Sequence, residues 1–361
     1  MSSFLKHERL LMAAVLATAL GYGFEHVFLS QGRAVALVVS GLLIAAILLA
    51  SVRVAHHAEL LAEKVGDPYG TMILTLSAVL VEVVVLAIMM MHEPSPTLVR
   101  DTIYSAVMLD INGILGLAAI IGGLKHGEQP YNDDSARTYS VMILTAMGIS
   151  MVVPEFIPEA SWHAYSAFTI GAMVVLYAVF LRMQTNDHSY FFSYNYPERK
   201  RKAGEAVPEP VSLPGSIGVM IAGVVVVGAL AELMSKSLGL GLKDTGAPPM
   251  LIALVVAGIS AGPEILTALR AALANRMQSV VNIAMGASLS TVILTVPVME
   301  AIALYSGEPF QMAMTPVQTV MVFITLIVAA INLNDGETNA IEGMTHFVLF
   351  ATFLMLMALG L

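Results

Sequence analysis

The chain has 361 residues, of which 57% are hydrophobic and only 12% charged, and its net charge is −9. A soluble domain carries about 25% charged residues, so this composition excludes a soluble globular protein and indicates a polytopic membrane protein. The chain has no cysteine, which excludes disulfides, thiolate metal sites and cysteine nucleophiles.

Apolar runs between glycine, proline and charged residues supply eleven segments near the length of about 20 residues that a helix needs to cross a bilayer. The first has the charge pattern of a signal peptide but no persuasive small-x-small cleavage site, so we expect it to be retained. The predicted spans are residues 10–30, 34–53, 69–91, 98–123, 138–157, 163–183, 214–237, 248–272, 278–304, 314–333 and 342–361.

One long polar break divides these spans. Residues 184–213 are charged and proline-containing, and are predicted to form a linker. The linker separates a leading helix (1–33) and a first set of five helices (34–183) from a second set of five (214–361). Because each set has an odd number of helices, the second set must enter the membrane inverted. The predicted fold is all-α, with one leading helix plus two inverted five-helix repeats, an arrangement typical of secondary transporters.

Lysine and arginine predict the orientation, because they are enriched in cytoplasmic loops. With the amino terminus inside, four cations lie outside and thirteen inside. This bias predicts a cytoplasmic amino terminus, a cytoplasmic linker and an external carboxyl terminus. The outer four are Arg33, Arg100, Lys236 and Lys243.

Two glutamates lie near the middle of apolar spans that occupy equivalent places in the two halves. Glu82 lies in "LTLSAVLVEVVVLAI" and Glu264 in "LIALVVAGISAGPEILTAL". An intramembrane carboxylate usually marks an ion or proton pathway, and a neutral carboxyl that only joins two helices is the alternative. Gly262 and Pro263 directly precede Glu264, so we expect that helix to break and to free carbonyls for a hard cation.

The helix after each glutamate carries small or oxygen-bearing side chains. Asp110 and Asn112 follow Glu82, and Ser288, Ser290 and Thr291 follow Glu264. These residues line the same cavity or, alternatively, pack helices together. For Asp110 a further alternative is an ion pair with Arg100. Other polar residues are expected at helix ends or in loops, namely Glu155, Glu159, Glu232, Glu300, His56 and His346.

Three stretches carry a family resemblance: "GDPYGTMILTLSAVLVEV", "SAGPEILTALRAALANRMQSVVNIAMGASLSTVILTVPVM" and "DGETNAIEG". They resemble the calcium/cation antiporter superfamily in its cation/proton exchanger branch, and most closely the bacterial calcium-sodium-potassium/proton antiporters. Glu264, Gly286 and Pro297 match the spacing of the family's second signature, and Glu82 matches the first. Residues 78–81, Ala-Val-Leu-Val, replace the Gly-Asn-Ala-x run of the first signature, so its coordinating asparagine is absent.

The resemblance implies a secondary antiporter of the bacterial cytoplasmic (inner) membrane. It would export Ca²⁺, and also Na⁺ or K⁺, in exchange for protons by alternating access at a two-glutamate site. Glu82 and Glu264 are the expected metal ligands, with Asn112, Asp110, Ser288, Ser290 and Gly262 completing the cation and proton site. A monovalent-selective Na⁺(K⁺)/H⁺ antiporter and a cation channel are the alternatives.

No resident cofactor is expected, since the cations are cargo. The expected partners are small inorganic cations, protons and the lipid bilayer, without nucleic acid, and a homo-oligomer is left open. The sequence has no H-E-x-x-H and no G-x-x-x-x-G-K-[ST], so we expect neither a zinc protease nor a direct ATPase. The "GISAG" stretch matches a hydrolase elbow only in its letters, because Ser260 lies in an apolar helix.

Overall fold

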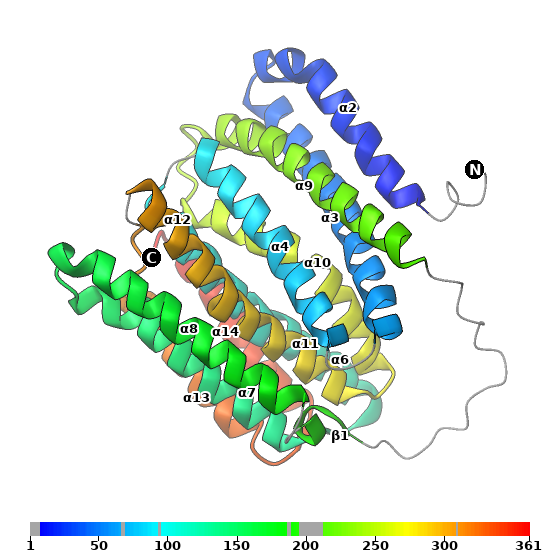
Figure 1. The fold of residues 1–361 in the computed structure, drawn as a ribbon, viewed down its shortest axis with the longest axis vertical. Helices are drawn as coiled ribbons and strands as arrows, with labels where there is room; N and C mark the ends of the chain where they lie inside the picture. Colours follow the sequence, from blue (N-terminus) through cyan, green and yellow to red (C-terminus); the bar gives the residue numbers. More distant parts are fainter. Residues whose placement is uncertain (1–7, 66–68, 93–94, 186–188, 195–211, 308–309) are drawn as a thin grey trace.

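The computed structural model describes the chain except for residues 1–7, 66–68, 93–94, 186–188, 195–211 and 308–309 (Figure 1). Ten helices in the described part are long and apolar enough to span a membrane, and the shorter apolar helix α13 (Pro316–Asn332) completes the eleven predicted spans. The polytopic all-α fold is confirmed. Most of the predicted linker, residues 184–213, lies outside the described residues.

The leading helix α2 (Arg9–Ser30) precedes the first set of five spans. In the third of these spans, α5 and α6 are joined by the π-helical turn η1. The bounds are α3 (Arg33–Val65), α4 (Tyr69–His92), α5 (Leu98–Val107), η1 (Met108–Leu115), α6 (Gly116–His126), α7 (Asp133–Met147) with the π-helical η2 (Gly148–Val152) and the 3₁₀ turn η3 (Val153–Phe156), η4 (Glu159–Ser161) and α8 (Trp162–Thr185).

The second set repeats this plan, and its third span is again interrupted by a π-helical turn, η6. A two-residue antiparallel pairing of β1 (Gln129–Pro130) with β2 (Glu337–Thr338) joins a loop of each half. The remaining elements are η5 (Ser189–Phe192), α9 (Leu213–Leu242), α10 (Met250–Leu273), α11 (Met277–Ser290), η6 (Thr291–Thr295), α12 (Val296–Ser306), α13 and α14 (Ala340–Ala358).

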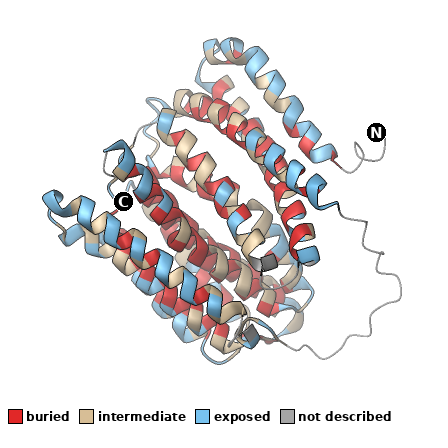
Figure 2. Cartoon of the chain, in the orientation of Figure 1, coloured by how far each residue is buried: buried red, intermediate tan, exposed pale blue. Residues whose placement is uncertain are grey.

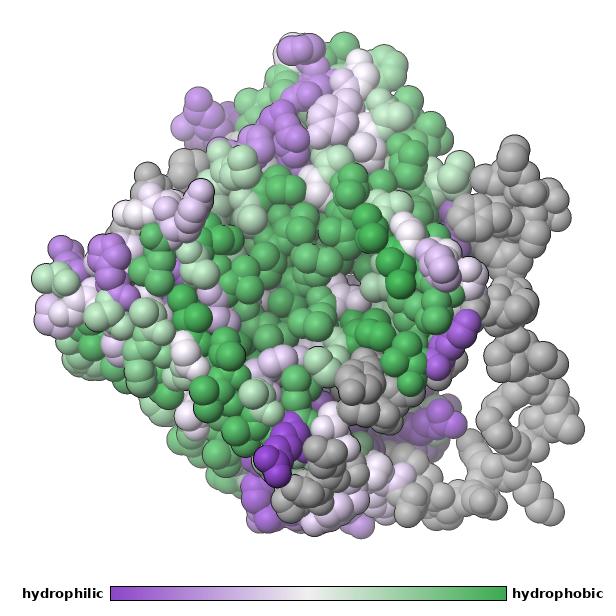
Figure 3. All heavy atoms as spheres, in the orientation of Figure 1, coloured by the Kyte–Doolittle hydropathy of each residue, from purple (hydrophilic) through white to green (hydrophobic). Residues whose placement is uncertain are grey.

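The third span of each half forms the centre of the bundle. Of their most apolar windows, 72% is buried in Leu98–His126 and 61% in Met277–Ser306, against 11–44% in the other long spans. Helices α2 and α8 lie at the flanks and are largely exposed (Figure 2). Figure 3 shows a broad hydrophobic surface over the middle of one face, with hydrophilic residues gathered toward the helix ends. A surface of this kind faces lipid.

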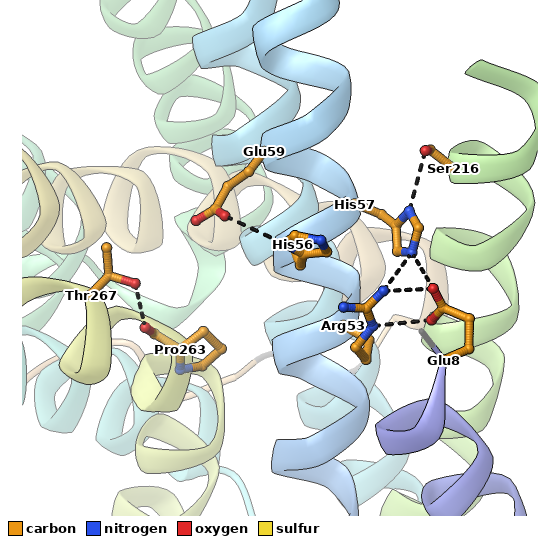
Figure 4. A network of polar contacts seen from close by, with 8 residues as sticks. All are labelled: Glu8, Arg53, His56, His57, Glu59, Ser216, Pro263 and Thr267. Atoms are coloured by element: carbon orange, nitrogen blue, oxygen red, sulfur yellow. Dashed lines mark hydrogen bonds and ion pairs between the residues drawn. The ribbon is translucent and has the colours of Figure 1, made fainter. Parts of the chain in front are cut away.

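Helix α3 is longer than predicted, because the expected end at Arg53 is not a helix stop. The Arg53 guanidinium donates to the Glu8 carboxylate at 3.0 and 2.6 Å, and His57 Nε2 lies 3.0 Å from the same carboxylate. His57 Nδ1 lies 3.2 Å from the Ser216 hydroxyl at the start of α9 (Figure 4). We call Glu8, Arg53, His57 and Ser216 the clamp. It joins the leading helix to the first helix of each half.

The predicted break at Pro263 is wrong, since α10 runs through it as one helix. A proline removes one backbone donor, but neighbouring helices hold such kinked or weakened turns together in membrane proteins. Gly262 provides close packing here: a Cβ at this position would collide with the Leu48 side chain of α3. Thr267 donates its hydroxyl to the Pro263 carbonyl at 3.0 Å, on the side of α3 opposite the clamp (Figure 4).

Candidate cation site

Glu82 is buried at the centre of the bundle, with 2% of its surface exposed. It lies on α4, and its Oε2 accepts hydrogen bonds from the hydroxyls of Thr291 at 3.0 Å and Thr295 at 3.3 Å. Both threonines lie on η6, in the other half of the chain. Its Oε1 has no hydrogen-bond partner among the described residues. A carboxyl of one half is therefore held by hydroxyls of the other, with one oxygen unused.

Asp110 is the second buried carboxyl, also 2% exposed, and lies on η1. Its Oδ2 accepts a hydrogen bond from Ser288 of α11 at 3.2 Å. Its Oδ1, like Glu82 Oε1, finds no partner in the part of the chain that the structure describes. The prediction that Asp110 and Ser288 line one site is consistent with this contact. The alternative pairing with Arg100 is wrong, because Arg100 Nη2 lies 2.8 Å from Asp101 instead.

Glu264 lies on α10, which packs against η1 as α4 packs against η6. It is half-buried and close enough to Asp110 and Glu82 to interact with both electrostatically. The three carboxyls do not form a ready metal cage: among the described residues no group of three or more His, Asp or Glu side chains is spaced to hold a metal. A cation would have to draw them together.

A cavity of about 620 Å³ reaches Glu264 from the linker side. Gln184 and Ser193 line its mouth, and Ser290 lines its inner part together with Glu264. Glu82 is not among the lining residues. The cavity therefore extends from the linker side to Glu264 but is not lined by the Glu82 carboxyl.

The side-chain amide of Asn112 contacts α13 and α14 rather than the buried carboxyls. Its Nδ2 donates to Thr325 of α13 at 2.7 Å, and its Oδ1 lies 3.0 Å from His346 Nδ1 of α14. Because an amide oxygen accepts, His346 carries its proton on Nδ1 in this arrangement. Asn112 thus joins η1 to α13 and α14. Ser290 donates to the Ala287 carbonyl at 2.9 Å and remains available to the cavity.

Two expectations about polar residues are wrong. His346 is 2% exposed and lies against Asn112 rather than at an interface or in a loop. Glu300 was expected to be solvated at a helix end, yet it is 4% exposed on α12. Both residues have apolar neighbours in the sequence, which do not reveal that the polar side chain faces the bundle interior. Which face of a helix is buried depends on how the helices pack in three dimensions.

Thr295 also contacts Glu82, although it was not among the residues predicted for the site. Its signal is the spacing: Thr291 and Thr295 are four residues apart, so in a helical span they lie on nearly the same face. Two hydroxyls on one face of an otherwise aliphatic segment can serve a single acceptor, as they do here for Glu82.

The chain matches the protein family described as sodium/calcium exchanger protein over residues 35–186 and 215–359, one segment on each side of the linker. The chain belongs to this exchanger family. An exchanger of this family is a multi-pass membrane protein that moves ions, and the repeated helical plan with its central carboxyls is consistent with that role.

The exchanger is similar to the sodium-potassium/proton antiporter ChaA of Escherichia coli, with 32% identity over 331 residues that cover 90% of each chain. It is 24% identical over 290 residues to a Ca²⁺/H⁺ antiporter of Aphanothece halophytica, covering 75% of this chain and 76% of that one. Its fold resembles the solved structure of native YfkE, with a TM-score of 0.75, 18% identity, and coverage of 96% and 99% of the two chains.

Proposed function

We propose that the protein is a cation/proton antiporter that carries Ca²⁺, and also Na⁺ or K⁺, at a site built on Glu82, Glu264 and Asp110. The observation that carries the proposal is the pair of unused oxygens, Glu82 Oε1 and Asp110 Oδ1, on carboxyls that interact electrostatically with Glu264 in the cavity wall. Neutral hydroxyls reach only one oxygen of each carboxyl, and a buried carboxylate whose charge is not balanced is strongly unfavourable. Each carboxyl therefore needs either a proton or a cation.

Competition for the same oxygens supplies the exchange. A proton and a metal cation cannot occupy one carboxylate oxygen together, so a cation that enters from the open side displaces protons. Because the donors Thr291 and Thr295 lie in the opposite half from Glu82, a movement of one half against the other changes the surroundings of the carboxyl. Alternating access of this kind is typical of inverted-repeat transporters.

The number of carboxyls favours a divalent ion as cargo, whereas the names of the relatives include both monovalent and divalent ions. Ca²⁺ takes six to eight oxygens, which Glu82, Glu264, Asp110, Ser288 and Ser290 supply in part. ChaA of Escherichia coli is named a sodium-potassium/proton antiporter, whereas the relative from Aphanothece halophytica is named for Ca²⁺. A monovalent-selective antiporter is the second candidate, and the higher identity of ChaA favours it.

The decisive experiment follows proton movement in proteoliposomes after each cation is added separately. Glu82→Gln and Glu264→Gln should each abolish cation-driven proton flux, because an amide cannot exchange a proton in this way. Glu155→Gln is the matched control, since Glu155 is exposed. Near-normal flux in either intact site variant would refute the two-glutamate site, and cation flux without any proton flux would indicate a channel.

The domain boundaries and the orientation belong to the same proposal: a leading helix (1–33), two repeats (34–183 and 214–361) and a cytoplasmic linker (184–213) in the inner membrane. The absence of cysteine makes labelling direct. Single cysteines at Ser193 and Asp244 should react from opposite sides of the membrane, with Ser193 on the cytoplasmic side. Reaction of both from one side would refute the inverted arrangement.

A further inference from the structure

A second cavity lies on the side of the bundle away from the linker. The span of α11, η6 and α12 begins at Met277, near linker-side contacts such as that of Asn282 with the Phe192 carbonyl, and ends at Ser306 on the opposite side. Near this far end, α12, the start of α8 and residues 310–313 enclose a cavity of about 860 Å³. One water occupies about 30 Å³ of liquid, so this space has room for a hydrated cation.

Glu300 is the buried acid of this cavity. It is 4% exposed and lines the cavity wall. Ser166 of α8 lines the cavity beside it and interacts with its carboxyl, and Oε2 is buried and finds no partner among the described residues. Glu300 thus repeats the condition of Glu82 and Asp110: an acid inside the bundle with one oxygen unused.

The charges around Glu300 favour a cation. Glu159 lines the same cavity from the exposed turn η4, which precedes α8. Arg100 donates to the carbonyl of Ala313, a residue of the cavity wall, at 3.0 Å, but its charge is paired with Asp101 through contacts of 2.9 and 2.8 Å. The Tyr165 hydroxyl donates to the Ile149 carbonyl at 2.7 Å, so its proton is not available to Glu300.

Glu300 also lies on the element that holds the central site. Thr295, which donates to Glu82, is five residues earlier on the same span. At 1.5 Å per residue, Glu300 is about 7.5 Å farther along the axis, away from the linker side. Val296 and Met299, both fully buried, lie between them. On this span the linker-side cavity is lined as far as Ile293, and the far cavity is lined by Glu300 and Ala303, so these buried residues lie between the two cavities.

We propose that Glu300 forms a second cation-binding site, in the far cavity, which takes either a proton or a hard cation. Its ligands are the Glu300 carboxylate and the Ser166 hydroxyl, with Glu159 attracting cations at the rim. Only the role of this site in transport depends on the proposed function: cations would leave and protons would enter through it on the side away from the linker. Its binding does not depend on Glu82 or Glu264.

The test uses dicyclohexylcarbodiimide, which modifies protonated carboxyls in apolar surroundings, on the full chain in lipid nanodiscs at fixed pH. Mass spectrometry of the peptide that contains Glu300 should show labelling that falls at least about fivefold when Ca²⁺ or Na⁺ is added. The same protection should persist in the Glu82→Gln/Glu264→Gln protein, in which the proposed central site is disabled. Glu300→Gln should remove the label, and Glu155→Gln should leave it unchanged.

Three outcomes would overturn this site. Absence of label at Glu300 would show that the carboxyl is not a protonated group open to the cavity. Label that no cation reduces would make Glu300 a structural carboxyl. Protection that disappears in the Glu82→Gln/Glu264→Gln protein would mean that Glu300 only reports occupancy of the central site. If the reconstituted protein fails to transport but cations still reduce the labelling of Glu300, the proposed function is refuted and the Glu300 site is supported.

Discussion

Replacement of Thr291 by valine tests how the second half of the chain controls Glu82. The hydroxyl donates to Glu82 Oε2 at 3.0 Å, and valine has nearly the same shape without the donor. A hydrogen bond to a charged group contributes about 1.5–3 kcal/mol, and about 1.4 kcal/mol is a factor of ten. Donation favours the ionised carboxylate, which a cation requires. Thr291→Val should therefore raise the half-saturating Ca²⁺ concentration roughly tenfold.

Thr295 provides a graded comparison, because its bond to the same oxygen is longer, at 3.3 Å. Thr295→Val should raise half-saturation roughly threefold, about 0.7 kcal/mol on the same scale. Both increases should shrink as the pH rises, since fewer protons then compete for Glu82. Thr145→Val is the control, because Thr145 is exposed and donates only to the Val141 carbonyl. The assay is Ca²⁺-dependent proton release from proteoliposomes over a range of pH.

Two results would contradict this reasoning. If Thr295→Val has the larger effect, bond length does not set the contribution of each donor. If neither variant changes half-saturation while both are folded, the threonines do not stabilise the form of Glu82 that binds the cation.

Two further predictions concern the clamp and the choice of ion. Burial alone would raise the pKa of Glu8, but hydrogen bonds from Arg53 and His57 and their charges bring that pKa below its usual value. Glu8→Gln should therefore destabilise the protein at pH 7 by about 2 kcal/mol, less than a fully buried pair. In thermal unfolding in detergent the deficit should vanish as the pH falls through the lowered pKa of Glu8, where native Glu8 is also neutral; a deficit that persists there would exclude a charge effect. Asp110→Asn should weaken Ca²⁺ exchange more than Na⁺ exchange, because the lost charge acts on twice the ionic charge, and equal losses in flux assays would remove Asp110 from the selectivity of the site.

The sequence predicted the fold well because membrane spans depend on hydrophobic length, which is local. Helices such as α2 and α4 begin and end within about two residues of the predicted runs. The equivalent places of Glu82 and Glu264 in the two halves also followed from the order of the spans. The end of α3 did not, because the predicted span ended at charged Arg53, whose partner Glu8 lies 45 residues earlier in the chain.

The acids of the candidate site and one neutral partner, Ser288, were predicted from the sequence, whereas the contact of Thr295 and the direction of Asn112 were not. Glu82, Asp110 and Ser288 meet because they lie on packed helices from both halves. The direction of Asn112 toward His346 depends on the rotation of η1, and hydropathy does not indicate the rotation of a segment that is buried on nearly all sides. The continuity of α10 at Pro263 likewise depends on its neighbours rather than on the proline itself.

The π-helical turn η6 has a consequence for how sequences of this kind can change over evolution. A π-turn accommodates one residue more than an α-turn, so loss of a single residue from Thr291–Thr295 would let the span close as a continuous α-helix and keep the residues after it near their present orientation. The α-helical stretch from Val296 to Glu300 cannot absorb such a loss; a deletion there would rotate everything after it by about 100° and carry Glu300 out of its cavity with almost no change in hydropathy. The spacing from Val296 to Glu300 should therefore tolerate substitutions far more readily than insertions or deletions.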